Sequence, residues 1–132
     1  MNQQNPTGAN PWADIVGPCY TPASLARALG WTEAKVNEAA DSLALLRLTT
    51  SDGVECYPAF QVQDGEPLNG LADVLRVLRS GIDAPWTWAQ WLNTPLTDED
   101  GVVQPANIER LRAGQLTEVL LEARHDAATW RG

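Results

Sequence analysis

The chain has 132 residues, of which 44% are hydrophobic and 20% are charged, and its formal net charge at neutral pH is −8. This composition excludes a chain that is disordered along its whole length, and the length suits one domain or two very small packed units. The acidic balance weighs against broad affinity for nucleic acid, because that affinity comes from lysine and arginine side chains that neutralise phosphates.

The sequence lacks the signatures of a membrane helix, of export and of a zinc site. No apolar run reaches about 18 residues, and residues 1–17 have neither the basic start nor the apolar core of a secretory signal. The two cysteines, Cys19 and Cys56, are far apart in the sequence, and the single histidine is His125, so a zinc site lacks ligands. We therefore expect a cytoplasmic protein with reduced thiols and no metal or other cofactor. Residues 1–11 are expected to form a flexible N-terminus.

Residues 21–43 have the pattern of a helix-turn-helix. Thr21 can cap a helix that opens with a proline, and Gly30 ends that helix by supplying the backbone freedom of a tight turn. Thr32 is the N-cap candidate of a second helix, over residues 33–43. Apolar side chains recur along one face of each helix, with Leu25, Ala26 and Leu29 in the first and Val36, Ala39, Ala40 and Leu43 in the second. The alternative is an ordinary pair of antiparallel helices inside a helical domain.

The next segment predicts a two-stranded β-wing. The stretch ALLRLTT at 44–50 is typical of a strand, and VECYPAF at 54–60 alternates and returns. Between them, SDG at 51–53 indicates a hairpin turn, because Asp-Gly tolerates a positive φ. Two helices followed by such a ribbon make a winged helix-turn-helix, which we assign to residues 12–65.

The second helix of such a fold would read DNA through residues near its N-terminus. Lys35 can contact a phosphate or a guanine, and Asn37 can pair with adenine. The side chains that we expect on DNA are Thr32, Lys35, Asn37 and Arg47.

Acidic side chains oppose this interaction. Glu33, Glu38 and Asp41 on the second helix would repel phosphates, as would Asp52 and Glu55 on the wing. We therefore expect a monomer to bind operator DNA weakly and a homodimer or a partner to be needed for useful affinity. The alternative is a winged helix that serves as a structural or protein-binding module.

The second half, residues 66–132, is expected to form a small helical domain. Helical segments are predicted over 70–81, which Gly81 closes, from Pro85 onward, over 105–114, and from 116 to Trp130. The apolar positions are Leu71, Val74, Leu75 and Leu78 in the first segment, Ile108 and Leu111 in the third, and Leu116, Val119, Leu120, Ala123, Ala127 and Trp130 in the last. The stretch LTDEDGV at 96–102 is predicted to be an acidic turn, and it lacks the alternating ligands and distal glutamate of a calcium loop.

Tryptophans are concentrated in this half. Trp88 and Trp91 share a helical face with Leu92 and are expected in the core. Trp86 lies off that face and is expected to be exposed, which is typical of an interface. Trp130 is either a packed staple or an anchor presented to a partner, and we favour the staple.

The order of motifs in the second half resembles the toxin-binding domain of Xre/MbcA/ParS-type antitoxins. The matching residues are Trp91, Leu92, Pro95, Gly101, Pro105, Leu111, Gly114 and Val119. The upstream stretches YTPASLARALGWTEAKVNEA and YPAFQV are similar to small actinobacterial winged-helix DNA-binding proteins that carry the same kind of tail. Together the resemblance covers about residues 19–126.

The resemblance implies a non-enzymatic, antitoxin-like DNA-binding regulator. Its C-terminal domain would bind a RES-domain toxin, an enzyme that degrades NAD. The domain would mask this toxin by occluding its cleft. The surface that we expect to contact the partner uses Trp86, Arg124, Trp130 and Arg131. The alternative is a stand-alone winged-helix regulator of transcription or of the nucleoid, with no toxin partner.

An enzyme is disfavoured. His125 and Asp126 are adjacent, so on a helix they point about 100° apart and do not form an orienting pair. The sequence shows no nucleophile elbow, phosphate loop or metal cluster. The expected fold is mostly α with a small two-stranded β-wing, with about six helices in two packed subdomains.

Overall fold

The computed structural model describes residues 16–132, and the expectation for residues 1–11 lies outside that range. Helix α2 (Pro22–Leu29) is capped by Thr21, whose hydroxyl accepts the Ser24 N–H at 3.0 Å, and Ser24 returns the bond to the Thr21 N–H. Helix α3 (Glu33–Asp41) is capped by Thr32, and Gly30 has the expected left-handed conformation with φ of 70°. The helix-turn-helix is confirmed.

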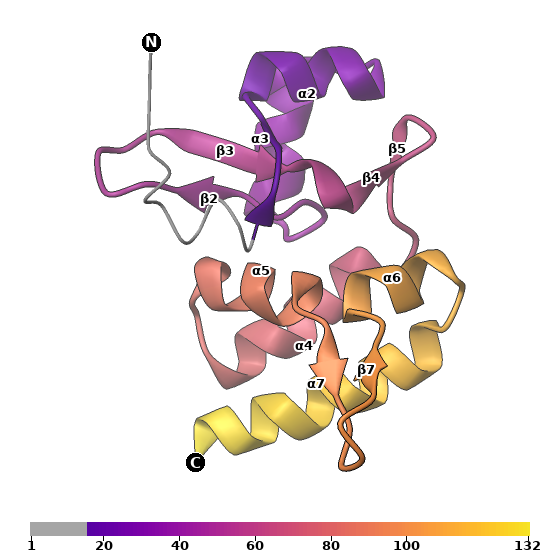
Figure 1. The fold of residues 1–132 in the computed structure, drawn as a ribbon. Coiled ribbons are helices and arrows are strands. Elements are labelled where there is room, and N and C mark those ends of the chain that lie inside the picture. Colours follow the sequence, from indigo (N-terminus) through magenta and orange to yellow (C-terminus); the bar gives the residue numbers. More distant parts are fainter. Residues whose placement is uncertain (1–15) are drawn as a thin grey trace, which may run out of the picture.

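The wing is confirmed, and it belongs to a larger sheet. Strands β2 (Leu48–Thr49) and β3 (Glu55–Pro58) form the expected hairpin, in which Gly53 has a φ of 85°. Strand β1 (Cys19–Tyr20) pairs antiparallel with the other edge of β3, so the sheet order is β1-β3-β2. The expectation of two strands was incomplete because β1 precedes α2 and meets β3 only when the chain folds back (Figure 1).

Residues 62–131 form four helices and two hairpins of short strands. The hairpins are β4 (Val62–Gln63) with β5 (Glu66–Pro67), and β6 (Leu96–Thr97) with β7 (Val103–Gln104). The helices are α4 (Leu71–Gly81), α5 (Pro85–Asn93), α6 (Asn107–Arg112) and α7 (Leu116–Arg131). The expected boundary between residues 65 and 66 falls inside the turn of the β4–β5 hairpin. Within residues 16–132, no helix is both long and apolar enough to cross a membrane.

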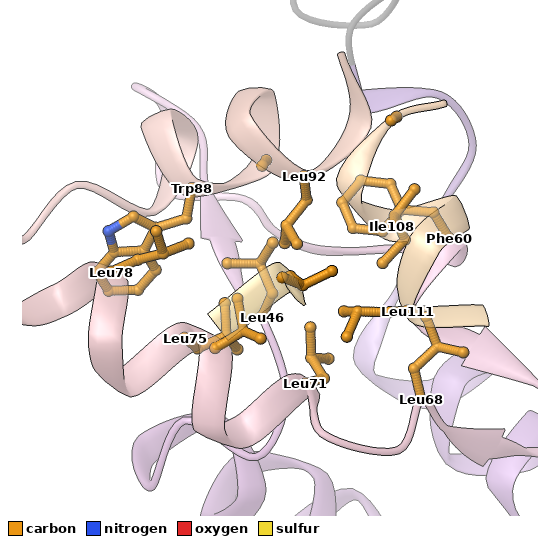
Figure 2. Packing of buried hydrophobic residues seen from close by; sticks show 14 of the residues in the cluster. Leu46, Phe60, Leu68, Leu71, Leu75, Leu78, Trp88, Leu92, Ile108 and Leu111 are labelled. Carbon is orange, nitrogen blue, oxygen red and sulfur yellow. The ribbon is translucent and has the colours of Figure 1, made fainter. Parts of the chain in front are cut away.

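Two clusters of buried side chains hold the molecule together. The first lies within the winged helix-turn-helix and consists of Leu25, Ala26, Leu29, Val36, Ala40, Leu45 and Tyr57. The second joins both halves, because Leu46, Leu48 and Phe60 pack with apolar side chains of α4, α5, α6 and α7. Figure 2 shows Leu46 and Phe60 among Leu71, Leu75, Trp88, Leu92, Ile108 and Leu111. The two expected subdomains therefore share a continuous core.

A buried amide fixes the segment between α3 and β2 onto that core. Gln61 is fully buried, and its Oε1 accepts the Leu46 N–H at 2.7 Å. Its Nε2 donates to the Leu46 carbonyl at 2.9 Å and to the Pro58 carbonyl at 3.0 Å. The side chain thus satisfies both backbone groups of Leu46, which lies outside the strands.

Helix α4 ends at Gly81 as expected, and this glycine has a second role. It is the last residue of α4, and the helix is capped by Ile82. A Cβ atom on Gly81 would lie 2.5 Å from the Ala127 Cα of α7. The glycine therefore also permits the close approach of α4 and α7.

The acidic turn expected at 96–102 is the tip of the β6–β7 hairpin. The Asp98 carboxylate accepts the N–H groups of Asp100 and Val102, both at 2.9 Å, and the Gln104 side-chain amide at 3.0 Å. These hydrogen bonds, above all the one from Val102, lower the pKa of Asp98. The Asp98 carboxylate therefore stabilises the turn. This structural role is an alternative to the calcium binding that acidic loops can serve.

Candidate nucleic-acid interface

Helix α3 is packed against the protein on one face and exposed to solvent on the other. Val36 and Ala40 are buried against α2, and Ala39 is half-buried. Helical periodicity puts Ala34, Glu38 and Asp41 at the centre of the opposite face, and all three are exposed. The helical wheel of α3 indicates this stripe from the sequence, because Val36, Ala39 and Ala40 gather on one side and define the buried face.

Lys35 and Asn37 flank that central stripe. Both are exposed, and their separation of two residues puts them on different sides of it. The Lys35 Nζ lies 4.3 Å from the centre of the Trp31 ring, a cation–π contact that orients the ammonium near the N-terminus of α3. The Thr32 hydroxyl is occupied as the cap of α3, so its exposed position serves the helix first.

Arg47, expected to contact DNA, is engaged with acidic side chains of the protein itself. Its Nη2 donates to Asp41 Oδ1 at 2.8 Å, and its Nε lies 3.9 Å from Glu55 Oε2. The hydrogen bond to Asp41 raises the pKa of Arg47. The side chain joins the end of α3 to the wing, since Glu55 lies on β3.

Few positive charges belong to the winged helix-turn-helix itself, although Arg76 of α4 lies beside the end of α3 and donates to the Ser42 carbonyl at 3.2 Å. Within residues 16–65, the basic side chains other than Arg47 are Arg27 on α2 and Lys35 on α3. Both are exposed. Exposed acidic side chains on α3 and the wing outnumber them, namely Glu33, Glu38, Asp41, Asp52 and Glu55. The electrostatic attraction of this face for phosphates is therefore small.

The four side chains expected at a partner surface are not brought together. Trp86 is half-buried rather than exposed, and its Nε1 donates to the Thr49 carbonyl of β2 at 3.1 Å. Arg131 donates to the Ser80 carbonyl at 3.3 Å and thereby joins the ends of α7 and α4. Arg124 is exposed and, seven residues from Arg131, shares its side of α7. Trp130 packs against the core from another side, as expected of a staple.

The other two tryptophans of α5 lie in or beside the core. Trp88 is buried, and its Nε1 donates to the Ile82 carbonyl at 2.9 Å. Trp91 is half-buried, and its Nε1 donates to Asp126 Oδ2 at 2.7 Å. The expected shared face of these tryptophans is confirmed, while Asp126 bonds to Trp91 and its neighbour His125 is exposed.

The two cysteines are free thiols on neighbouring strands. Cys19 is opposite Pro58 in the β1–β3 pair, so Cys56 is its diagonal neighbour. Burial, together with the nearby Cys56 thiol, raises the pKa of Cys19 to about 12. Cys19 therefore remains a protonated thiol at neutral pH.

Comparisons with known proteins bear on the fold. No protein family and no curated protein matches the chain. Among solved structures, it is similar to the NMR structure of Rv2175c, with a TM-score of 0.71 over 92% of this chain and 86% of that chain. The two proteins share one fold. Their sequences are 24% identical, so the similarity to Rv2175c supports the architecture alone.

Proposed function

We propose that the protein is a cytoplasmic, non-enzymatic DNA-binding regulator whose helix α3 enters the major groove. The observation that carries this proposal is a complete winged helix-turn-helix in which the outward face of α3 is uncovered by the second half of the chain. In such folds the second helix lies in the groove and the first helix crosses the phosphate backbone. Helices α3 and α2 would take these two roles.

The residues of α3 suggest how bases would be read. Glu38 lies at the centre of the outward face, and a carboxylate there can accept a hydrogen bond from the amino group of cytosine. Asn37 can pair with adenine on one side of it. Lys35 and Arg27 are the residues assigned to phosphates. Arg47 would act indirectly, by fixing the wing against the end of α3.

The charge balance sets the expected strength of binding. Two phosphate contacts per copy predict that the logarithm of the association constant falls with the logarithm of salt concentration with a slope of about −2. A homodimer on paired half-sites would double that slope and supply the affinity that one copy lacks. The measured slope therefore also reports the number of copies bound.

The test is fluorescence anisotropy of a duplex from the region upstream of the protein's own gene, over a series of salt concentrations. Lys35→Glu should abolish binding at moderate salt. Arg124→Glu makes the same change in net charge on α7, far from α3 in sequence, and should bind as the unchanged protein does. Equal losses in the two variants, or no binding by the unchanged protein even at low salt, would overturn the proposal.

A second candidate is the masking of a RES-domain toxin by the C-terminal half. It is favoured by apolar side chains that the β6–β7 hairpin presents to solvent, with Leu96 40%, Val102 54% and Val103 67% exposed. Co-expression with a RES-domain protein encoded beside the gene should yield a complex that survives gel filtration. Replacing Val102 and Val103 with serine should release the toxin. A complex that survives these replacements would contradict a role for the hairpin.

A further inference from the structure

A groove between α5 and α7 lies in the second half of the chain. It encloses about 230 Å³ and is lined by residues that include Trp91, Leu96, Asn107, Glu122, Asp126 and Trp130. Leu96 contributes from the β6–β7 hairpin, and no residue of the winged helix-turn-helix lines the groove. Its lining is therefore separate from the proposed DNA-binding face.

The side chains that α7 contributes to the groove recur at a regular spacing. Glu122, Asp126 and Trp130 are spaced four residues apart, so two carboxylates and an indole follow one another along one side of the helix. Trp91 faces them from α5, and its Nε1 hydrogen bond to Asp126 Oδ2 at 2.7 Å fixes both side chains. Asp126 Oδ1 makes no hydrogen bond to any residue that the structure describes.

The charge of the groove is unbalanced. Among the residues that line it, two are acidic and none is lysine, arginine or histidine. The neighbouring hairpin adds Asp98, Glu99 and Asp100 at its exposed tip. A cationic group would therefore be attracted to this side of the molecule, and an anionic group would be repelled.

We propose that this groove binds an arginine side chain from a basic segment of a partner protein. A guanidinium is planar, so it can stack on an indole while its N–H groups bond to a carboxylate. Trp91 and Trp130 supply the indole faces, and Glu122 and Asp126 supply the carboxylates. A second hollow of about 780 Å³ shares Leu96 and Glu122 with the groove and extends past Pro105. Its lining includes both Glu109 and Arg110, so it gives room for flanking residues of the segment without adding net charge.

The test uses the full isotope-labelled chain and a hexa-arginine peptide at about 0.15 M salt, where long-range attraction between exposed charges is screened. NMR should show that the indole N–H signals of Trp91 and Trp130 move on titration, while a hexaglutamate peptide leaves them in place. Asp126→Asn retains an acceptor for the Trp91 N–H and removes the charge. This variant should bind the peptide about fivefold more weakly, as expected for one exposed ion pair.

The matched control is Asp100→Asn, which removes one carboxylate from the hairpin tip and should change the affinity less than twofold. Equal weakening by the two substitutions would mean that the peptide responds only to the net charge, and the proposal would be wrong. Indole signals that stay in place while the peptide binds would also overturn it. Lys35→Glu, which should abolish DNA binding, should leave peptide binding unchanged. A failure of the arginine proposal can therefore be distinguished from a failure of the proposed DNA binding.

Discussion

Gln61 shows how one side chain can replace a strand partner. Its amide makes three hydrogen bonds to the backbone, two of them to Leu46, in a fully buried setting. Nothing in the sequence distinguishes this glutamine from the exposed Gln63 two residues later. Its role depends on the backbone of a segment that is 15 residues away, so local patterns could not have predicted it.

Replacing Gln61 with methionine should destabilise the protein strongly. The substitution keeps the length of the side chain but leaves the Leu46 N–H and carbonyl buried without partners, which should lower the free energy of unfolding by about 2–4 kcal/mol. Urea denaturation followed by tryptophan fluorescence measures the loss. Gln63→Met, at an exposed position of β4, should stay within about 0.5 kcal/mol of the unchanged protein. Similar losses in both variants would contradict the role of the buried amide.

The residues of the candidate site were predicted in part. Thr32, Lys35 and Asn37 could be placed near the start of α3 because the cap and the apolar spacing are local. The ion pairs of Arg47 with Asp41 of α3 and Glu55 of β3 could not be predicted, because they form only when the three segments come together. Ion pairs across elements depend on tertiary structure, which spacing along the chain does not report.

The helices and strands also divide into those that local sequence signals predict and those that depend on tertiary contacts. Helices α2 and α3 were predicted with their caps, since threonine and glycine signals act within one turn of the chain. Five strands of two residues each, β1, β4, β5, β6 and β7, were missed, because each is defined by its pairing rather than by its composition. The end of α4 at Gly81 was predicted, but the close crossing of α4 and α7 at this glycine was not.

Gly81→Ala tests the packing of α4 on α7. Alanine has the higher helix propensity, by about 1 kcal/mol. The added methyl would, however, lie 2.5 Å from the backbone of Ala127, which cannot move aside as a flexible side chain would. The steric term should win, and the free energy of unfolding should fall by about 1–3 kcal/mol. Arg79→Ala, at an exposed position of the same turn, should have little effect. A Gly81→Ala variant more stable than the unchanged protein would contradict the close crossing.

The β6–β7 hairpin should lose order in acid. The pKa of Asp98 is lowered in the folded hairpin by hydrogen bonds to its carboxylate, so the charged form stabilises the turn. This contribution is present above the pKa of an unfolded aspartate and is lost as the pH falls below about 4, through the folded value. Amide exchange of Val102, measured by NMR, should quicken over that range beyond the rate expected from pH alone. In Asp98→Ala, exchange should already be fast at neutral pH. Equal protection in the two proteins would rule out this role for the carboxylate.

At the scale of the whole molecule, the two halves share a core but present different surfaces. Leu46, Leu48 and Phe60 tie the winged helix-turn-helix to the four helices behind it, and Trp86 adds a hydrogen bond to β2. Helices α2 and α3 lie in one half and α5 and α7 in the other (Figure 1). The outward face of α3 is exposed, and the groove is lined by residues of the second half. This arrangement suits a protein that binds DNA through one half and a protein partner through the other.

The most direct test is an NMR titration of the isotope-labelled protein with operator DNA, which maps the contact residue by residue. We predict that the largest shifts fall on the backbone amides of residues 32–38 and on Arg27. The amides of residues 116–131 should stay in place. Shifts confined to α7, or DNA binding that leaves α3 unchanged, would contradict the account.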